Sequence, residues 1–163
     1  MKYKKFIEKF KKQVHKLSYE KQLSFAIVIC KNLYPQYQNF YLTHQWGDPD
    51  MLIDATMLLE QAQKSSIAKS EIEVMRSKVY GVTPDMDDFG DDVGTYALYA
   101  ASAVYFALQF LLTKNPMDIF HVGDSFYNVV DCKVQEDDDL NERQIEKHPL
   151  VRGAQLYLLE LTR

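Results

Sequence analysis

The chain has 163 residues, of which 47% are hydrophobic and 26% are charged, the balance of one globular domain with a substantial core. Aromatic residues make up 13%, which argues against a disordered chain, and six glycines with five prolines are too few for the turns of an all-β protein. The formal net charge is −4 at pH 7, yet residues 1–16 hold seven lysines and one glutamate. The remaining body is therefore strongly acidic, and general binding to nucleic acid is not expected.

A basic amphipathic helix is expected over residues 2–16. Phe6, Phe10 and Val14 recur there at helical spacing, and lysines occupy many of the positions between them. Such a helix could touch a membrane or an acidic partner, but its narrow apolar face favours packing on the rest of the protein, with the lysines in solvent. No apolar signal core follows these lysines, so we expect a cytoplasmic protein with no membrane partner.

Two helices are expected between Ser18 and the turn at residues 47–49. Ser18 is a good N-cap for the first of them. Pro35 disfavours helical backbone in the residue before it, so this helix is expected to end there and a shorter one to follow over about 36–45. The turn places an aspartate before a proline, which suits the N-cap and first position of the next helix.

The middle of the chain is expected to contain two amphipathic helices and then an uncharged one. A weak break at Ser65-Ser66 separates the first two, and Gly81 is expected to close the second as a C-cap. After the loop of residues 82–92, the run Val93–Leu112 contains no charged residue. Its length could span a bilayer. Its many alanines, tyrosines and polar residues are more typical of the buried centre of a helical bundle.

The last third of the chain is expected to hold two longer helices and a short turn. Asn115 caps a helix that opens with Pro116, the acidic connector Glu136–Asp139 follows, and Pro149 opens the final helix. We therefore expect an all-α protein. It is a single-domain helical bundle over residues 1–163, with about seven to eight helices around a central apolar helix at about 93–113.

The loop of residues 82–92 is distinctive because it carries five aspartates. An EF-hand is excluded, since counting from Asp85 places Phe89 at the fifth position and Tyr96 at the twelfth. The aspartates could cap the central helix and favour its dipole, or they could form an acidic surface for a partner. The residues expected to bind a partner are Asp85, Asp87, Asp88, Asp91, Asp92, Glu136, Asp137, Asp138 and Asp139.

Motifs for catalysis, metals and cofactors do not occur in the sequence. Cys30 and Cys132 form no C-x-x-C pair, the four histidines lack zinc-site spacing, and neither a nucleophile elbow nor a glycine-rich phosphate loop is found. We expect no enzymatic activity and no catalytic residue, metal or cofactor. His44 and Trp46 could line a pocket, although a tryptophan at a helix end is more often a core anchor.

The order of these features resembles a known bacterial family. The segment Leu17–Asp48, the loop Thr83–Phe89 before the uncharged helix, and the start of the last helix at His148–Val151 are similar to the YjaG-like proteins, domain of unknown function 416. The resemblance covers about residues 17–162 and implies an all-helical fold with no established chemistry. The Lys-rich start and the end at Arg163 depart from the family pattern.

These observations favour a non-enzymatic protein-binding module that attracts its partner through acidic loops. One concrete form is an immunity protein that neutralises a basic toxin or effector. One alternative is a small-ligand-binding or enzymatic protein with a pocket near His44, Trp46 and the loop Asp85–Asp92. Another is a structural homo-oligomer that uses exposed aromatic residues.

Overall fold

The computed structural model describes residues 1–137 and 139–163, except for the side chain of Asp137. Eight α-helices and no strands are found in this part of the chain, which confirms the expected all-α bundle. The helices are α1 (Tyr3–Lys16), α2 (Tyr19–His44), α3 (Pro49–Ala62), α4 (Lys69–Gly81), α5 (Asp92–Thr113), α6 (Pro116–Asp137), α7 (Glu142–Lys147) and α8 (Pro149–Leu161).

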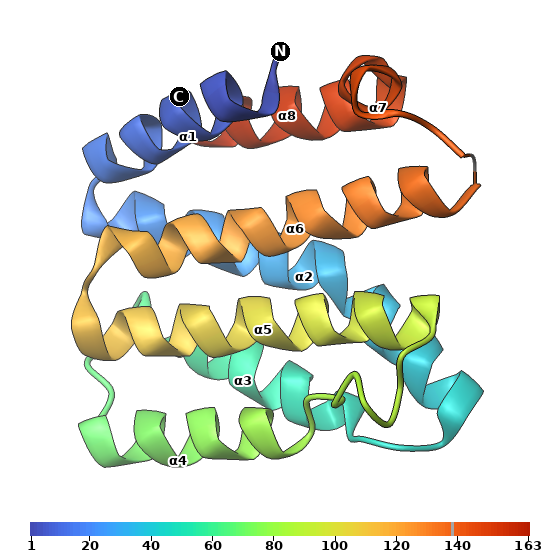
Figure 1. The fold of residues 1–163 in the computed structure, drawn as a ribbon. Coiled ribbons are helices and arrows are strands. Elements are labelled where there is room, and N and C mark those ends of the chain that lie inside the picture. Colours follow the sequence, from blue (N-terminus) through green and yellow to red (C-terminus); the bar gives the residue numbers. More distant parts are fainter. Residues whose placement is uncertain (138) are drawn as a thin grey trace.

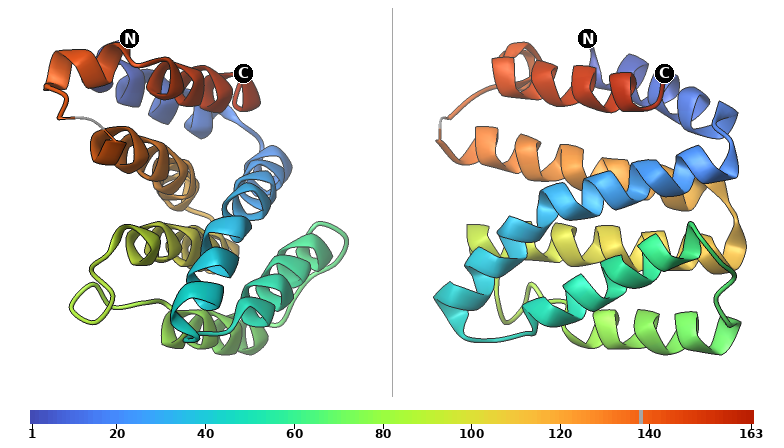
Figure 2. Two further views of the ribbon diagram at one scale, coloured as in Figure 1. Left: turned by 90° about the vertical axis from the view of Figure 1, so that its right-hand side faces the viewer. Right: turned by 180° about the vertical axis from the view of Figure 1, so that it is seen from behind.

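The helices are arranged around the antiparallel pair α5 and α6. In Figure 1, α1, α6, α5 and α4 are stacked from top to bottom, and each packs against its neighbour in this order. The long helix α2 crosses behind α6 and α5 and contacts both, while α3 lies beside α2 on the same side (Figure 2). Helix α8 packs against α6 and α1, so the two ends of the chain meet at one edge of the bundle.

Helix α5 forms the centre of the core, as expected. It packs against α2, α3, α4 and α6, and many of its buried residues are alanines, which let neighbouring helices approach closely. By length and composition it is the one helix in the described residues that could cross a membrane. Half of its most apolar window is buried inside this bundle, where it serves as the core helix.

Helix α2 runs without interruption through Pro35, so the expected break and the separate helix over 36–45 are wrong. A proline inside a helix removes one hydrogen bond and costs about 3 kcal/mol. Leu33, Tyr37 and Phe40 are buried on both sides of it, while Pro35 itself is exposed. Full burial of each such side chain stabilises by roughly 1.5–3 kcal/mol, so packing outweighs the local preference.

Two other boundaries differ from expectation. Gly81 is the last residue of α4 and has no left-handed backbone, so it is not the glycine C-cap that the sequence indicated. Thr83 instead donates its hydroxyl to the carbonyl of Val79 beyond the helix end. Helix α6 continues to Asp137, so Glu136 belongs to a helix and not to the expected connector.

Candidate functional site

The aspartate loop between α4 and α5 is folded by its own polar groups. Asp85 Oδ1 accepts a hydrogen bond of 2.9 Å from the backbone N–H of Asp87. The carbonyl of Asp85 accepts a second one, of 2.8 Å, from the N–H of Phe89. These bonds close a tight turn, which an aspartate side chain favours because it can bond to the backbone two residues on. The turn directs the ring of Phe89 towards the end of α2.

The ring of Phe89 packs among three rings at the end of α2. Its centroid lies 5.2 Å from that of Phe40, 5.2 Å from that of His44 and 5.0 Å from that of Trp46. Phe40 is fully buried, so this cluster joins the loop to the core. The space between His44 and Trp46, where the sequence suggested a pocket, is therefore occupied by Phe89. Neither phenylalanine stood out in the sequence, because each looked like an ordinary core residue.

Asp91 joins the loop to two helices. It is the N-cap of α5, and its Oδ1 accepts from the N–H of Gly94 at 2.8 Å. Its Oδ2 lies 2.8 Å from Nε2 of His44 at the end of α2. The bond from Gly94, and then the interactions with His44, lower the pKa of the Asp91 carboxyl. The expectation that an aspartate of this loop caps the central helix is confirmed.

The second acidic segment reaches the same end of the bundle. The hydroxyl of Tyr96, in the second turn of α5, donates to Glu136 near the end of α6. Burial, and then Glu136 and Asp92, raise the pKa of Tyr96. Figure 1 shows why these groups meet: the start of α5 and the end of α6 lie side by side in the antiparallel pair. Tyr96 and Glu136 are 40 residues apart in the sequence, so the loop of residues 85–92 and the end of α6 at Glu136 share one surface, which we call the acidic end.

The acidic end is made of exposed carboxylates. All predicted partner-binding residues whose side chains are described are exposed, whereas Asp138 and the side chain of Asp137 lie outside the described residues. These carboxylates fall into two groups. Those of Asp85, Asp91 and Glu136 accept hydrogen bonds from other residues of this chain. Within the described part of the chain, the carboxylates of Asp87, Asp88 and Asp92 enter no hydrogen bond or ion pair. Those residues are therefore available to a partner.

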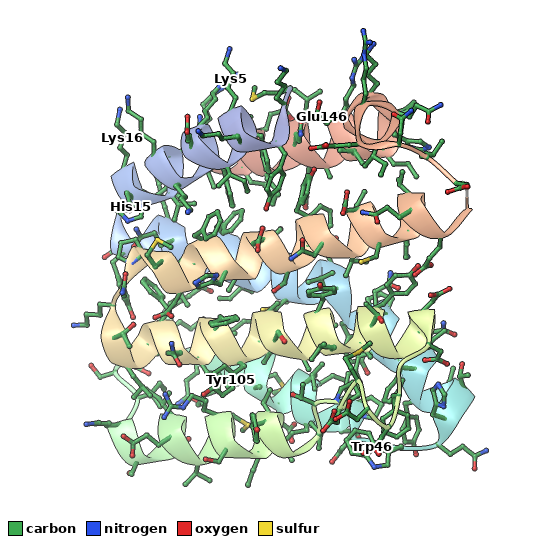
Figure 3. All side chains as sticks on the ribbon, in the orientation of Figure 1. Lys5, His15, Lys16, Trp46, Tyr105 and Glu146 are labelled. Atoms are coloured by element: carbon green, nitrogen blue, oxygen red, sulfur yellow. The ribbon has the colours of Figure 1, made fainter. Side chains whose placement is uncertain are left out.

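Three apolar side chains of α2 and the loops near its end are exposed to solvent. Leu42 in the last turn of α2 is 71% exposed, and Trp46 and Met86 are 37% and 36% exposed. In Figure 3 the labelled Trp46 lies at the loop end of the molecule, away from the labelled lysines of α1. Exposed aromatic and methionine side chains such as Trp46 and Met86 are enriched in protein–protein interfaces. No group of three or more metal-binding side chains converges anywhere in the described residues.

The geometry defines an all-helical bundle with an acidic end, and comparison with known proteins places it in a family. A model of the family described as "Protein of unknown function (DUF416)" matches residues 9–161. The chain belongs to this family, which confirms the resemblance seen in the sequence. A crystal structure of a DUF416 family protein from Shewanella baltica OS155 is similar in fold, with a TM-score of 0.80 and 25% identity. The match covers 94% of this chain and 83% of that one. No curated protein matches the chain.

Proposed function

We propose that this protein is a non-enzymatic binding module that presents its acidic end to a basic protein partner. The observation that carries the proposal is the meeting of the aspartate loop, residues 85–92, with Glu136 at the end of α6. Three of these carboxylates, those of Asp87, Asp88 and Asp92, have no partner among the described residues. Exposed carboxylates on one side of a small protein steer a basic partner towards that side and speed association.

The apolar residues at the acidic end would slow dissociation of the complex, which charge alone does little to change. Charges at the border of an interface mainly affect the association rate, whereas buried apolar and aromatic groups slow dissociation. Trp46, which packs on Phe89 of the loop and is 37% exposed, is suited to the second role. Trp46 is also held by Phe40 and Phe89, so it would lose little conformational freedom on binding.

A concrete form of this proposal is an immunity protein that covers a basic toxin or effector, such as a nuclease. The surface of such a toxin is positively charged where it contacts its nucleic-acid substrate. The negative charge of the acidic end is complementary to that surface. A toxin gene next to the gene for this chain would support this form.

The experiment compares two triple variants with the same change in net charge. The partner is first isolated by co-purification with the full chain, and its affinity is then measured across a range of salt concentrations. The test variant carries Asp87→Asn, Asp88→Asn and Asp92→Asn. The control variant carries Glu8→Gln, Asp54→Asn and Glu160→Gln, which neutralise exposed carboxylates on α1, α3 and α8.

The two variants should behave differently. We expect the test variant to bind at least about tenfold more weakly, with a smaller dependence on salt, and the control variant to bind almost as the wild type does. Equal affinity of the test variant and the wild type would contradict the acidic-end proposal.

The two alternative functions have less support from the geometry. Phe89 fills the space between His44 and Trp46, so a ligand pocket there would require the loop to move. A homo-oligomer would need an apolar face, and exposed Leu150 and Leu156 on α8 provide a small one. Light scattering over a range of protein concentrations tests this second alternative, because a constant monomer mass would exclude it.

A further inference from the structure

A second charged site lies where α1, α7 and α8 meet. A cleft of about 820 Å³ opens there between the start of α1, the whole of α7 and the first turn of α8. This volume falls within the range of small-molecule sites, roughly 300–1,000 Å³. Figures 1 and 2 both show the beginning of the chain beside α7 and α8, so the cleft joins segments from opposite ends of the sequence.

Positive charge dominates the lining of this cleft. Its five cationic side chains are those of Lys2, Lys4, Arg143, Lys147 and Arg152, against two carboxylates. Within the described residues, none of these five cations takes part in an ion pair with this chain. Cations that share one cleft and outnumber its carboxylates repel one another. An anion bound between them would relieve that repulsion.

The two carboxylates of the cleft offset part of this charge and leave an excess of positive charge. Glu146 is engaged by the backbone, since its Oε1 accepts from the N–H of Tyr3 at the start of α1, at 3.4 Å. Figure 3 shows its side chain extending from α7 towards α1. Glu142 is exposed in the first turn of α7, where the helix dipole favours an acidic residue. Both carboxylates therefore have a role in the fold in addition to offsetting part of the positive charge.

The walls of the cleft are held in place although one of them is the start of the chain. Gln155, which is buried on α8, donates to the carbonyl of Met1 at 3.0 Å. The ring of Tyr3 packs on that of Tyr127 in α6, with centroids 5.4 Å apart. Asn141 and Gln144 form a capping box that fixes the first turn of α7. The cations therefore project from an ordered frame, which reduces the entropy lost on binding.

We propose that this cleft binds a phosphate-bearing ligand with several negative charges. Arg143 and Arg152 present planar guanidinium groups, which bind phosphate oxygens in pairs, and the lysines add point charges around them. The ligand is either a free polyphosphate compound or the phosphorylated headgroup of a lipid. This site differs from the acidic end in the helices that form it, because its cations project from α1, α7, α8 and the residues before α1.

The test uses two probes that separate the sources of phosphate. Inorganic tripolyphosphate is titrated into the full chain by calorimetry at low ionic strength. In parallel, vesicles of phosphatidylcholine are compared with vesicles that also contain a phosphoinositide, by co-sedimentation. Binding of tripolyphosphate assigns a free anion, and binding only to the phosphoinositide vesicles assigns a headgroup. Binding of neither probe overturns the proposal.

Matched variants locate the binding in the cleft. Arg143→Gln with Arg152→Gln should weaken binding of the responding probe by roughly tenfold or more. The control, Lys9→Gln with Lys12→Gln, makes the same change in charge on the exposed face of α1 outside the cleft, and we expect less than about a twofold effect. Glu142→Gln should tighten binding because it removes a repelling carboxylate. Equal losses in the two double variants would overturn the proposal, since they would indicate general attraction to a basic surface.

Discussion

The Nε2 atom of His44 lies 2.8 Å from Oδ2 of Asp91, and this pair joins the end of α2 to the N-cap of α5 across 47 residues of sequence. The same carboxylate also accepts from the N–H of Gly94 through its other oxygen. One exposed aspartate thus connects the loop, the central helix and α2. The contribution of Asp91 to the stability of the fold can therefore be measured separately from the contribution of Asp87, Asp88 and Asp92 to partner binding.

Replacement of Asp91 by alanine should lower the free energy of unfolding by about 1 kcal/mol, the usual cost of losing a helix N-cap. The folded-state pKa of Asp91 is lowered, so its stabilising effect is complete above the ordinary carboxyl pKa and is lost as the pH falls through the lowered value. Urea unfolding of wild type and variant should therefore differ at neutral pH and converge in strong acid. The control is Asp87→Ala, which removes an exposed carboxylate of the same loop and should change stability by less than about 0.5 kcal/mol.

Replacement of Gly94 by alanine should destabilise the protein, although alanine is normally the better helix residue. A β-carbon at position 94 would collide with the carbonyl oxygen of Phe89, which is backbone and cannot turn aside. We expect a loss of about 1–3 kcal/mol, the usual cost of overpacking. Gly153→Ala in α8 is the matched control. Nothing lies within 4 Å of the added atom there, so it should stabilise by about 0.5–1 kcal/mol. Thermal unfolding measures both, and a gain in both variants would contradict the close approach at Gly94.

Replacement of Pro35 by alanine should stabilise α2. The change restores a backbone N–H inside a helix that already continues through this exposed position. The gain is reduced because proline also restricts the unfolded chain, so we expect a net increase of about 1–2 kcal/mol in the free energy of unfolding. Chemical denaturation checks the value. A loss of stability would mean that Tyr37 and Phe40 pack correctly only when the proline shapes the helix.

Replacement of Asp124 by asparagine should stabilise the protein at neutral pH. Its Oδ1 is buried without a hydrogen-bond partner among the described residues, and burial raises the pKa of the carboxyl. The ionised form therefore opposes folding above the raised pKa, and this penalty disappears below the ordinary carboxyl pKa. We expect a gain in the free energy of unfolding at neutral pH, because the neutral amide avoids the cost of burying a charge. Urea unfolding at several pH values should show this gain shrinking as the pH falls; a gain that did not depend on pH would contradict the charge explanation.

The sequence alone determined most of what depends on residues close together in the chain. Apolar spacing predicts α1, α5 and α8. Ser18 caps α2 as the sequence indicated, and Asp91 is one of the loop aspartates expected to cap α5, because a capping bond joins residues only a few positions apart. It also indicated the family, since the order of such local features along the chain carries the resemblance.

The tertiary structure decided what depends on contacts between distant segments. It keeps α2 helical through Pro35, because burial on both sides of the proline outweighs the local preference that predicted a break. It places Phe89 between His44 and Trp46, and it brings Glu136 to Tyr96 so that two acidic segments share one end. It also forms the basic cleft from the two ends of the chain. These outcomes follow from how helix faces pack against each other, which depends on residues far apart in the sequence.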